Sequence, residues 1–316
     1  MGNDTFYHQP VLLHECIEQL NIIPDGIYLD ATFGGGGHSR EILKQLSPKG
    51  KLLVFDQDED AKRNVPENDN RVVFIRENFR YAARFVRMYG LQLNGVLADL
   101  GVSSWQFDTA ERGFSTRFDA QLDMRMDHRL PVTAADILRQ YSEKELFRLF
   151  DQYGEVTNAK PLARRIVEVR EKAAIQTSNE LKQAIDGLMY GNPNKYLAQV
   201  FQGLRIEVND ELNALQEFLV SITSALKPGG RLCIITFHSL EDRLVKQWMK
   251  EEAFGSELLP MMMTAKPRLL KVLTKKPILP GIEEQNKNSR SRSAKLRVAE
   301  RILIDEFSTN KKKKDK

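Results

Sequence analysis

The sequence GIYLDATFGGGGHSREIL, from Gly26 to Leu43, decides the fold. Its apolar run ends at Asp30, four consecutive glycines follow, and a helical pattern begins at about His38. In a doubly wound sheet, ligands bind beyond the carboxyl ends of the strands, most often at the first strand-to-helix loop. Glycines there permit a tight turn and let a ligand approach the main chain. The stretch therefore predicts an α/β fold with a ligand site at this loop.

Apolar runs of similar length recur along the chain. KLLVFD, RVVFI, GVLADLG and GGRLCIITF are typical of buried strands, and helical patterns lie between or after them. This alternation predicts a parallel, doubly wound sheet. From about 109 to 212 the apolar positions instead follow helical spacing, with no convincing strand. We therefore expect a discontinuous sheet domain, residues 1–108 and 213–316, interrupted by an inserted all-helical domain, residues 109–212.

Composition places the chain among ordinary globular proteins. Of its 316 residues, 41% are hydrophobic and 28% are charged, and no apolar run reaches the roughly 18 residues of a membrane span. The two cysteines, Cys16 and Cys233, are too few for a disulfide framework, so we expect a reducing, cytoplasmic location. The five histidines lack the spacing of a zinc site, so we expect no metal.

The net charge of +4 is unevenly spread. Residues 261–316 hold sixteen Lys and Arg against six Asp and Glu, so the first 260 residues are net acidic. A basic segment on an acidic body indicates a polyanionic partner. The alternative is a solvated tail, which best describes the final KKKKDK, whereas SRSAKLRVAERI continues into a strand-like alternation.

Two cofactor classes fit the glycine loop, namely dinucleotides and S-adenosylmethionine. Asp56, at the end of the second strand, can accept hydrogen bonds from the ribose hydroxyls of either one. The dinucleotide pattern G-x-G-x-x-G is only partly met, because Ser39 holds the third glycine place. Asp30 favours S-adenosylmethionine, since a carboxylate can face its ammonium group but would repel a pyrophosphate. A methyltransferase is thus favoured over a dehydrogenase, and a loop that serves only packing is the third alternative.

Two further motifs place polar groups at strand ends. In GVLADLGVSSWQFD, Asp99 closes the fourth strand, where the acceptor of a methyl group would meet the cofactor. In FHSLED, His238 follows another strand. The alternative for Asp99 is a helix cap or a structural loop bond, and the alternative for His238 is a structural role.

These motifs together resemble the RsmH (MraW) family of ribosomal RNA methyltransferases. The resemblance implies a class I (Rossmann-like) S-adenosylmethionine-dependent methyltransferase fold with an inserted helical domain. It also implies methylation of the 4-amino group of one cytidine in small-subunit (16S) ribosomal RNA, near the decoding centre. The matching pieces extend from His8 to about Ile302: HQPVLLHE, YLDATFGGGGHS, DLGVSSWQFD, ERGFS, LDMRMD, FQGLRIEVNDEL, LKPGGRL, FHSLEDRLVK and SRSAKLRVAERI.

The resemblance also implies which residues bind the cofactor. Asp56 resembles the ribose partner, and Phe79 resembles the residue beside the adenine. Trp105 departs from the family, which often has Pro there. The set that the resemblance implies is Gly36, Gly37, His38, Asp56, Phe79, Asp99 and Gln106. With Asp30 and Gly35 of the first strand and its loop, these are the candidate cofactor-binding residues.

The chemistry narrows the candidate catalytic groups. The exocyclic amine of cytosine is a weak nucleophile, so methyl transfer needs close alignment and an acceptor for the N–H. Asp99 or a nearby main-chain carbonyl is the first candidate for that acceptor, and His238 is the second. Methylation at carbon 5 would need a cysteine nucleophile, but Cys233 and Cys16 are predicted within a strand and a helix. A dinucleotide-dependent oxidoreductase and a non-catalytic RNA-binding factor remain as alternatives.

Arginines supply the expected RNA contacts, and the expected partner is small-subunit ribosomal RNA or an assembled 30S subunit. For the arginines between 111 and 127, the alternative is pairing with neighbouring Asp and Glu. No membrane partner is expected, and the sequence leaves a homodimer open. The candidate RNA-binding residues are Arg112, Arg117, Arg125, Arg290 and Arg292.

Overall fold

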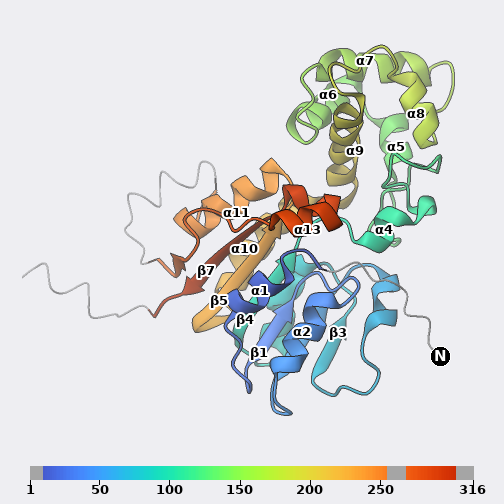
Figure 1. Cartoon of the computed structure of the whole chain (residues 1–316). Helices are drawn as coiled ribbons and strands as arrows, with labels where there is room; N and C mark the ends of the chain where they lie inside the picture. The colour runs from blue at the N-terminus through green and yellow to red at the C-terminus, as the bar shows by residue number, and fades with distance from the viewer. Residues whose placement is uncertain (1–9, 255–267, 304–316) are drawn as a thin grey trace, which may run out of the picture. The chain divides into compact units, whose positions relative to one another are not determined.

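The computed structural model describes residues 10–254 and 268–303, and the chain divides into two compact units (Figure 1). The sheet unit comprises residues 1–56, 61–101 and 214–316, and the helical unit comprises residues 57–60 and 102–213. The insertion expected at 109–212 thus falls within a unit that begins earlier, at Val102, and also includes 57–60. The final KKKKDK lies outside the described residues.

A seven-stranded sheet forms the centre of the sheet unit, in the order β3-β2-β1-β4-β5-β7-β6. The first five strands along the chain run parallel, while β7 runs antiparallel to β5 and β6. The strand order reverses between β1 and β4, which is where doubly wound sheets bind ligands. The predicted fold class is confirmed. The strands are β1 Ile27–Asp30, β2 Lys51–Phe55, β3 Val72–Ile75, β4 Leu93–Asp99, β5 Leu226–Thr236, β6 Leu270–Val272 and β7 Lys295–Arg301.

Both faces of this sheet are buried, which explains why its strands are continuous apolar runs. Neighbouring residues of β1 point to opposite faces, so Leu29 joins one apolar cluster and Tyr28 joins another. The first cluster includes Phe218 of α10, and the second includes Ile42 of α2. The helices are α1 Leu13–Leu20, α2 Gly37–Gln45, α3 Ala82–Met88, α10 Glu211–Thr223, α11 Ser239–Glu251 and α13 Ile282–Lys287, with 3₁₀ turns η1 Glu59–Asn64, η2 Phe79–Tyr81 and η5 Ser289–Ser293.

The helical unit has an apolar core of its own, which includes Phe150 and Leu204. Within residues 102–213, all described, no named strand occurs, as predicted. Side-chain capping boxes fix the starts of four helices, because Ser103, Thr133, Ser142 and Thr177 each accept a main-chain N–H three residues ahead. The elements are α4 Ser104–Asp108, η3 Ala110–Arg112, α5 Ala134–Gln140, α6 Glu143–Gln152, α7 Ala159–Arg170, α8 Ser178–Ala184 and α9 Pro193–Asn209.

In the part of the chain that the structure describes, no helix combines the length and apolar character needed to cross a bilayer. Cys16 lies in α1 and Cys233 in β5, and both are free and buried. Burial raises the pKa of the Cys16 thiol well above its usual range and that of Cys233 to about 12. Neither thiol is therefore prepared to act as a nucleophile.

Candidate active site

The glycine loop connects β1 to α2 through a tight turn. Gly34 and Gly36 have φ angles of 49° and 71°, in the left-handed region that favours glycine. The Gly36 N–H donates to the Phe33 carbonyl at 2.7 Å, and the Phe33 N–H donates to Phe55 of β2 at 2.8 Å. The Gly35 carbonyl accepts from Arg40 at 2.8 Å. The sequence thus folds here into a turn that is fastened to the neighbouring strand.

At two of the four glycines, a side chain would collide with other residues of the chain, whether or not a ligand is bound. A Cβ atom at Gly37 would lie only 2.1 Å from Cγ of Pro10, and one at Gly36 would lie 2.9 Å from the Phe33 ring. Sequence reasoning attributed the close approach to a ligand and missed Pro10. No local signal connects residues so far apart along the chain, so this contact could come only from the structure.

Asp56 stands directly after β2 and beside the glycine loop. Its Oδ2 accepts the Gly34 N–H at 2.7 Å, while Asn64 donates to the Gly34 carbonyl at 2.8 Å. Asp56 therefore anchors the turn from one side, and Asn64 anchors it from the other. Its role as a ribose partner stays a prediction, and its location at the end of β2 agrees with that role.

Asp30 ends β1 and is almost fully buried, with 2% of its surface exposed. Its Oδ1 accepts the Thr32 N–H at 3.1 Å, and its Oδ2 accepts the Ser39 hydroxyl at 2.6 Å. Burial raises the pKa of Asp30 to about 6, although both hydrogen bonds lower it. Ser39, at the third place of the partly met glycine pattern, thus links β1 to α2. The expected contact of Asp30 with an ammonium group stays a prediction.

Asp99 ends β4, and one of its carboxylate oxygens accepts no hydrogen bond from the described residues. Its N–H donates to the Thr32 hydroxyl at 2.6 Å, but its buried Oδ1 has no hydrogen-bond partner among the described residues. Burial raises the pKa of Asp99 well above its usual range, and the negative charges of Asp30, Glu241 and Glu284 raise it further. A buried acceptor without a partner is uncommon and indicates a place for a ligand donor.

His38 lies beside Asp99 in the first turn of α2. Its Nδ1 is 3.9 Å from Asp99 Oδ2, and its Nε2 is 3.1 Å from the Val11 carbonyl. Burial lowers the pKa of His38 to about 4, so the ring is neutral at pH 7. Because a carbonyl only accepts hydrogen bonds, we assign the proton to Nε2, which leaves Nδ1 as a bare acceptor facing Asp99.

Phe79 opens the turn η2, which follows β3. Its half-buried ring packs edge-on against Phe218, with 5.2 Å between the ring centres, and Asn78 caps the turn by accepting the Arg80 N–H. The ring is therefore held by the core of the sheet unit. Its contact with adenine stays a prediction.

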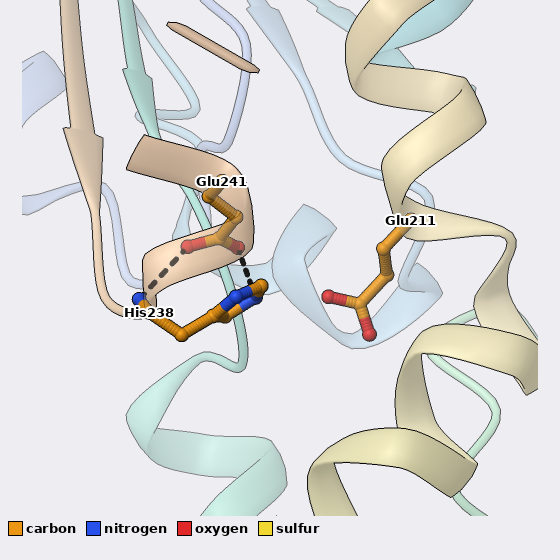
Figure 2. Close-up of side chains that lie close together, drawn as sticks. All are labelled: Glu211, His238 and Glu241. Carbon is orange, nitrogen blue, oxygen red and sulfur yellow. Dashed lines mark hydrogen bonds and ion pairs between the residues drawn. The ribbon is translucent and has the colours of Figure 1, made fainter. Parts of the chain in front are cut away.

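His238, the second candidate for the acceptor, is the N-cap of α11. Figure 2 shows its ring next to Glu241, with Nε2 3.1 Å from Oε1. The other carboxylate oxygen of Glu241 accepts the Phe237 N–H at 2.8 Å. This contact is an ion pair only if the ring is protonated, and neither ring nitrogen of His238 has a hydrogen-bond partner among the described residues. Its role as a proton acceptor therefore stays a prediction. Glu211, also drawn in Figure 2, pairs with Arg205 in the helical unit through contacts of 2.8 and 2.9 Å.

In the helical unit, two predicted site residues share one buried partner, Asp58. Gln106 donates to Asp58 Oδ2 at 2.7 Å and accepts the Ser103 N–H at 3.1 Å. Arg112 lies 2.8 Å from the same Oδ2 and also donates to the carbonyls of Arg125 and Met126. Arg112 is only 4% exposed. For this arginine the structure shows the intramolecular pairing that the sequence left as the alternative to an RNA contact.

The other candidate arginines differ in exposure. Arg125 forms a two-bond pair with Asp123 at 2.8 and 2.9 Å, and this hydrogen bonding raises its pKa. Arg117 pairs with Asp108 at 2.8 Å, but 56% of its side chain is exposed, and it lies over the Phe107 and Phe118 rings. Arg290 and Arg292 lie in η5, with Arg292 the more exposed. Arg117 and Arg292 are thus the most accessible of the five.

Comparison with known proteins now decides the family, because the MraW methylase family matches residues 5–302. The chain belongs to the MraW methylase family. Relatives from Christiangramia forsetii and Flavobacterium johnsoniae, both called "Ribosomal RNA small subunit methyltransferase H", are 50% and 51% identical to it. These alignments extend over 301 and 298 residues and cover 94% of this chain and 98% of each relative.

A solved structure of a rRNA methylase from Streptococcus thermophilus aligns with 92% of the chain and 94% of its own length, at a TM-score of 0.39 and 12% identity. The family assignment rests on the family match and the relatives. As a member of the MraW methylase family, the protein is an S-adenosylmethionine-dependent methyltransferase.

The glycine loop that follows β1 and Asp56 at the end of β2 fit this cofactor. S-adenosylmethionine, when bound, supplies an electrophilic methyl group on a positively charged sulfur. The main chain of the glycine loop has no side chains at Gly34, Gly35 and Gly36 to obstruct a ligand. Asp56 lies beside that loop.

Proposed function

We propose that this methyltransferase modifies the exocyclic 4-amino group of one cytidine in small-subunit (16S) ribosomal RNA, near the decoding centre. The relatives called "Ribosomal RNA small subunit methyltransferase H" support ribosomal RNA of the small subunit as the substrate class. The motif resemblance supports the choice of nucleotide. We further propose that it acts in the cytoplasm on the assembled or nearly assembled 30S subunit. The observation that carries the chemistry is the buried, unpartnered carboxylate oxygen of Asp99 at the end of β4.

An amino-methyltransferase has to make a weak nucleophile react. The lone pair of the cytosine amine is shared with the ring, so an acceptor that binds the N–H helps to localise it and takes up the proton. Asp99 Oδ1 is such an acceptor, because no group of the described residues occupies it. Its raised pKa makes the Asp99 carboxylate a stronger base than an exposed aspartate.

His38 supports Asp99 without competing for its proton. The ring is neutral at pH 7, and its bare Nδ1 faces Asp99 Oδ2 at 3.9 Å. A protonated histidine at this place would stabilise the Asp99 charge and lower its basicity. The burial of His38 therefore keeps the Asp99 carboxylate basic. We choose Asp99 over His238 as the catalytic acceptor because Asp99 ends β4, next to the reversal of strand order, whereas His238 lies at the start of α11 beside Glu241.

RNA contacts are proposed for the accessible arginines. Arg117 combines a charge with two neighbouring aromatic rings, a combination that suits an unstacked base. Arg292 is an exposed cation in the basic C-terminal segment, and we propose that it contacts an RNA phosphate. Arg112 and Arg125 are held in internal pairs, so we propose that they shape the helical unit rather than contact RNA.

The test is to incubate the protein and radiolabelled S-adenosylmethionine with small ribosomal subunits from a strain that lacks this activity, and then to analyse the nucleosides. We expect label in 4-N-methylcytidine. Label in another nucleoside would contradict the proposed target while leaving the enzyme class intact. No label on either subunits or free RNA, despite a thermal shift with the cofactor, would contradict the proposed substrate.

A further inference from the structure

A short segment before α1, residues 10–12, makes two contacts with the start of α2 and one with α13. Cγ of Pro10 occupies the space that a side chain on Gly37 would need. The Val11 carbonyl accepts from His38 Nε2 at 3.1 Å. The Leu12 N–H donates to Oε1 of Glu284 at 2.8 Å, across 272 residues of sequence. The C-terminal helix α13 thereby holds a segment that touches the cofactor loop.

The conformation of this segment requires such support. Leu12 has a φ angle of 54°, in the left-handed region, although it is neither glycine nor asparagine. A branched side chain rarely adopts this conformation and persists there only when its surroundings hold it. The Leu12 side chain is fully buried, and its main-chain N–H is bound by Glu284. The turn at Leu12 directs Val11 and Pro10 back over α2.

We propose that Glu284 is a positioning residue of the methyl-transfer site, because it holds segment 10–12 against His38 and the glycine loop. A continuous series of contacts runs from Glu284 to the Leu12 N–H, through Val11 to His38, and from His38 to Asp99. Without the Val11 carbonyl, the proton of His38 would no longer be fixed on Nε2. The link to Asp99 rests on the proposed function, whereas the link to the glycine loop depends only on the fold.

Glu284 also acts on Asp99 through its charge. The acidic groups that raise the pKa of Asp99, besides burial, are Asp30, Glu241 and Glu284. The other titratable groups near Asp99 are His38, which is neutral at pH 7, and the buried thiol of Cys16. Removing the charge of Glu284 should therefore lower the pKa of Asp99 and extend activity to lower pH.

Three variants of the full-length enzyme separate these roles. Glu284→Gln keeps an oxygen for the Leu12 N–H but removes the charge, whereas Glu284→Ala removes both. Glu283→Gln is the matched control, since Glu283 is an exposed acid in the same helix. The readouts are amide hydrogen exchange at Leu12, the affinity for S-adenosylmethionine by calorimetry, and the pH profile of kcat/KM for methyl transfer.

We expect Glu284→Ala to speed exchange at Leu12 by roughly tenfold or more, because a hydrogen bond to a charged group is lost, and to weaken cofactor binding by about tenfold. We expect Glu284→Gln to keep most of the protection and to move the acid limb of the pH profile to lower pH. Glu283→Gln should match the wild type in all three readouts.

The proposal is overturned if Glu284→Ala exchanges at Leu12 and binds cofactor like the control. A pH profile for Glu284→Gln that coincides with that of Glu283→Gln would overturn the link to Asp99. Should Glu284→Ala not fold, Glu284→Gln still decides through exchange at Leu12, which should be faster than in Glu283→Gln because a neutral acceptor forms a weaker hydrogen bond than a carboxylate. If the wild-type enzyme transfers no methyl group to small-subunit RNA, the proposed function fails, and exchange and cofactor affinity still decide the role of Glu284.

Discussion

Two aspartates, one in each unit, differ in what their carboxylate oxygens contact. In the helical unit, Asp58 is 4% exposed and its Oδ2 contacts both Gln106 and Arg112, at 2.7 and 2.8 Å. In the sheet unit, the Asp99 side chain is 25% exposed, but its buried Oδ1 has no hydrogen-bond partner among the described residues, and burial keeps the nearby His38 neutral. A carboxylate that is paired stabilises the protein around it, whereas one left unpaired at a strand end is available for chemistry.

The largest effect should come from breaking the paired aspartate. Arg112→Ala leaves Asp58 buried without its cation, which typically costs about 3–5 kcal/mol of unfolding free energy. Arg117→Ala is the matched control, because its partner Asp108 and its own side chain are 42% and 56% exposed, and such pairs contribute roughly 0–1 kcal/mol. Urea unfolding of the full chain measures both. Equal midpoints for the two variants would contradict the structural role of Arg112.

A smaller effect should come from Asp30, a buried acid of the sheet unit. Its pKa of about 6 in the folded protein lies above the usual 3.8, so the folded state retains a proton that the unfolded state has already lost. Stability from this group is therefore present at low pH and is lost as pH rises from about 4 to about 6. The full difference corresponds to about 3 kcal/mol at 1.36 kcal/mol per pKa unit.

Asp30→Asn removes this titration. The unfolding free energies of the wild type and the variant are measured between pH 4 and 7. As the pH falls across that range, the wild type should become more stable relative to the variant. Parallel curves would contradict the buried, proton-binding state of Asp30.

The smallest effect belongs to the surface charges proposed to contact RNA. Arg292→Ala should lower affinity for small-subunit RNA severalfold and reduce the slope of log K against log salt by about one. Lys44→Ala is the control, because Lys44 is an exposed cation that pairs with Glu41 in α2. Filter binding over a series of salt concentrations measures both slopes. An unchanged slope for Arg292→Ala would remove this residue from the RNA contacts.

The strands and the strand-end acids could be predicted because their signals are local. IYLD, KLLVF and LNGVLAD are buried on both faces and are therefore apolar along their length. The common location of three acids, Asp30, Asp56 and Asp99, could be predicted because each stands at the carboxyl end of a strand, and these ends of parallel strands meet at one edge of the sheet.

The remaining features depend on contacts between distant parts of the chain. The burial of Arg112 depends on Asp58, and Gln106 meets the same acid across 48 residues. Neither periodicity nor spacing in the sequence indicates such a distant partner. From the sequence alone, an arginine that pairs internally therefore cannot be distinguished from one that contacts RNA. The bond between Leu12 and Glu284 joins opposite ends of the chain and was likewise beyond sequence reasoning.

The most direct test of the account is the rate of methyl transfer by Asp99→Asn, measured in a single turnover with cofactor and small subunits both saturating. Loss of a positioned proton acceptor typically costs about 100-fold or more in rate, and we predict at least that loss with the fold retained. In the wild type the acid limb should lie above the ordinary aspartate range, since burial raises the pKa of Asp99. An Asp99→Asn enzyme that binds cofactor normally and transfers methyl groups at the wild-type rate would contradict the account.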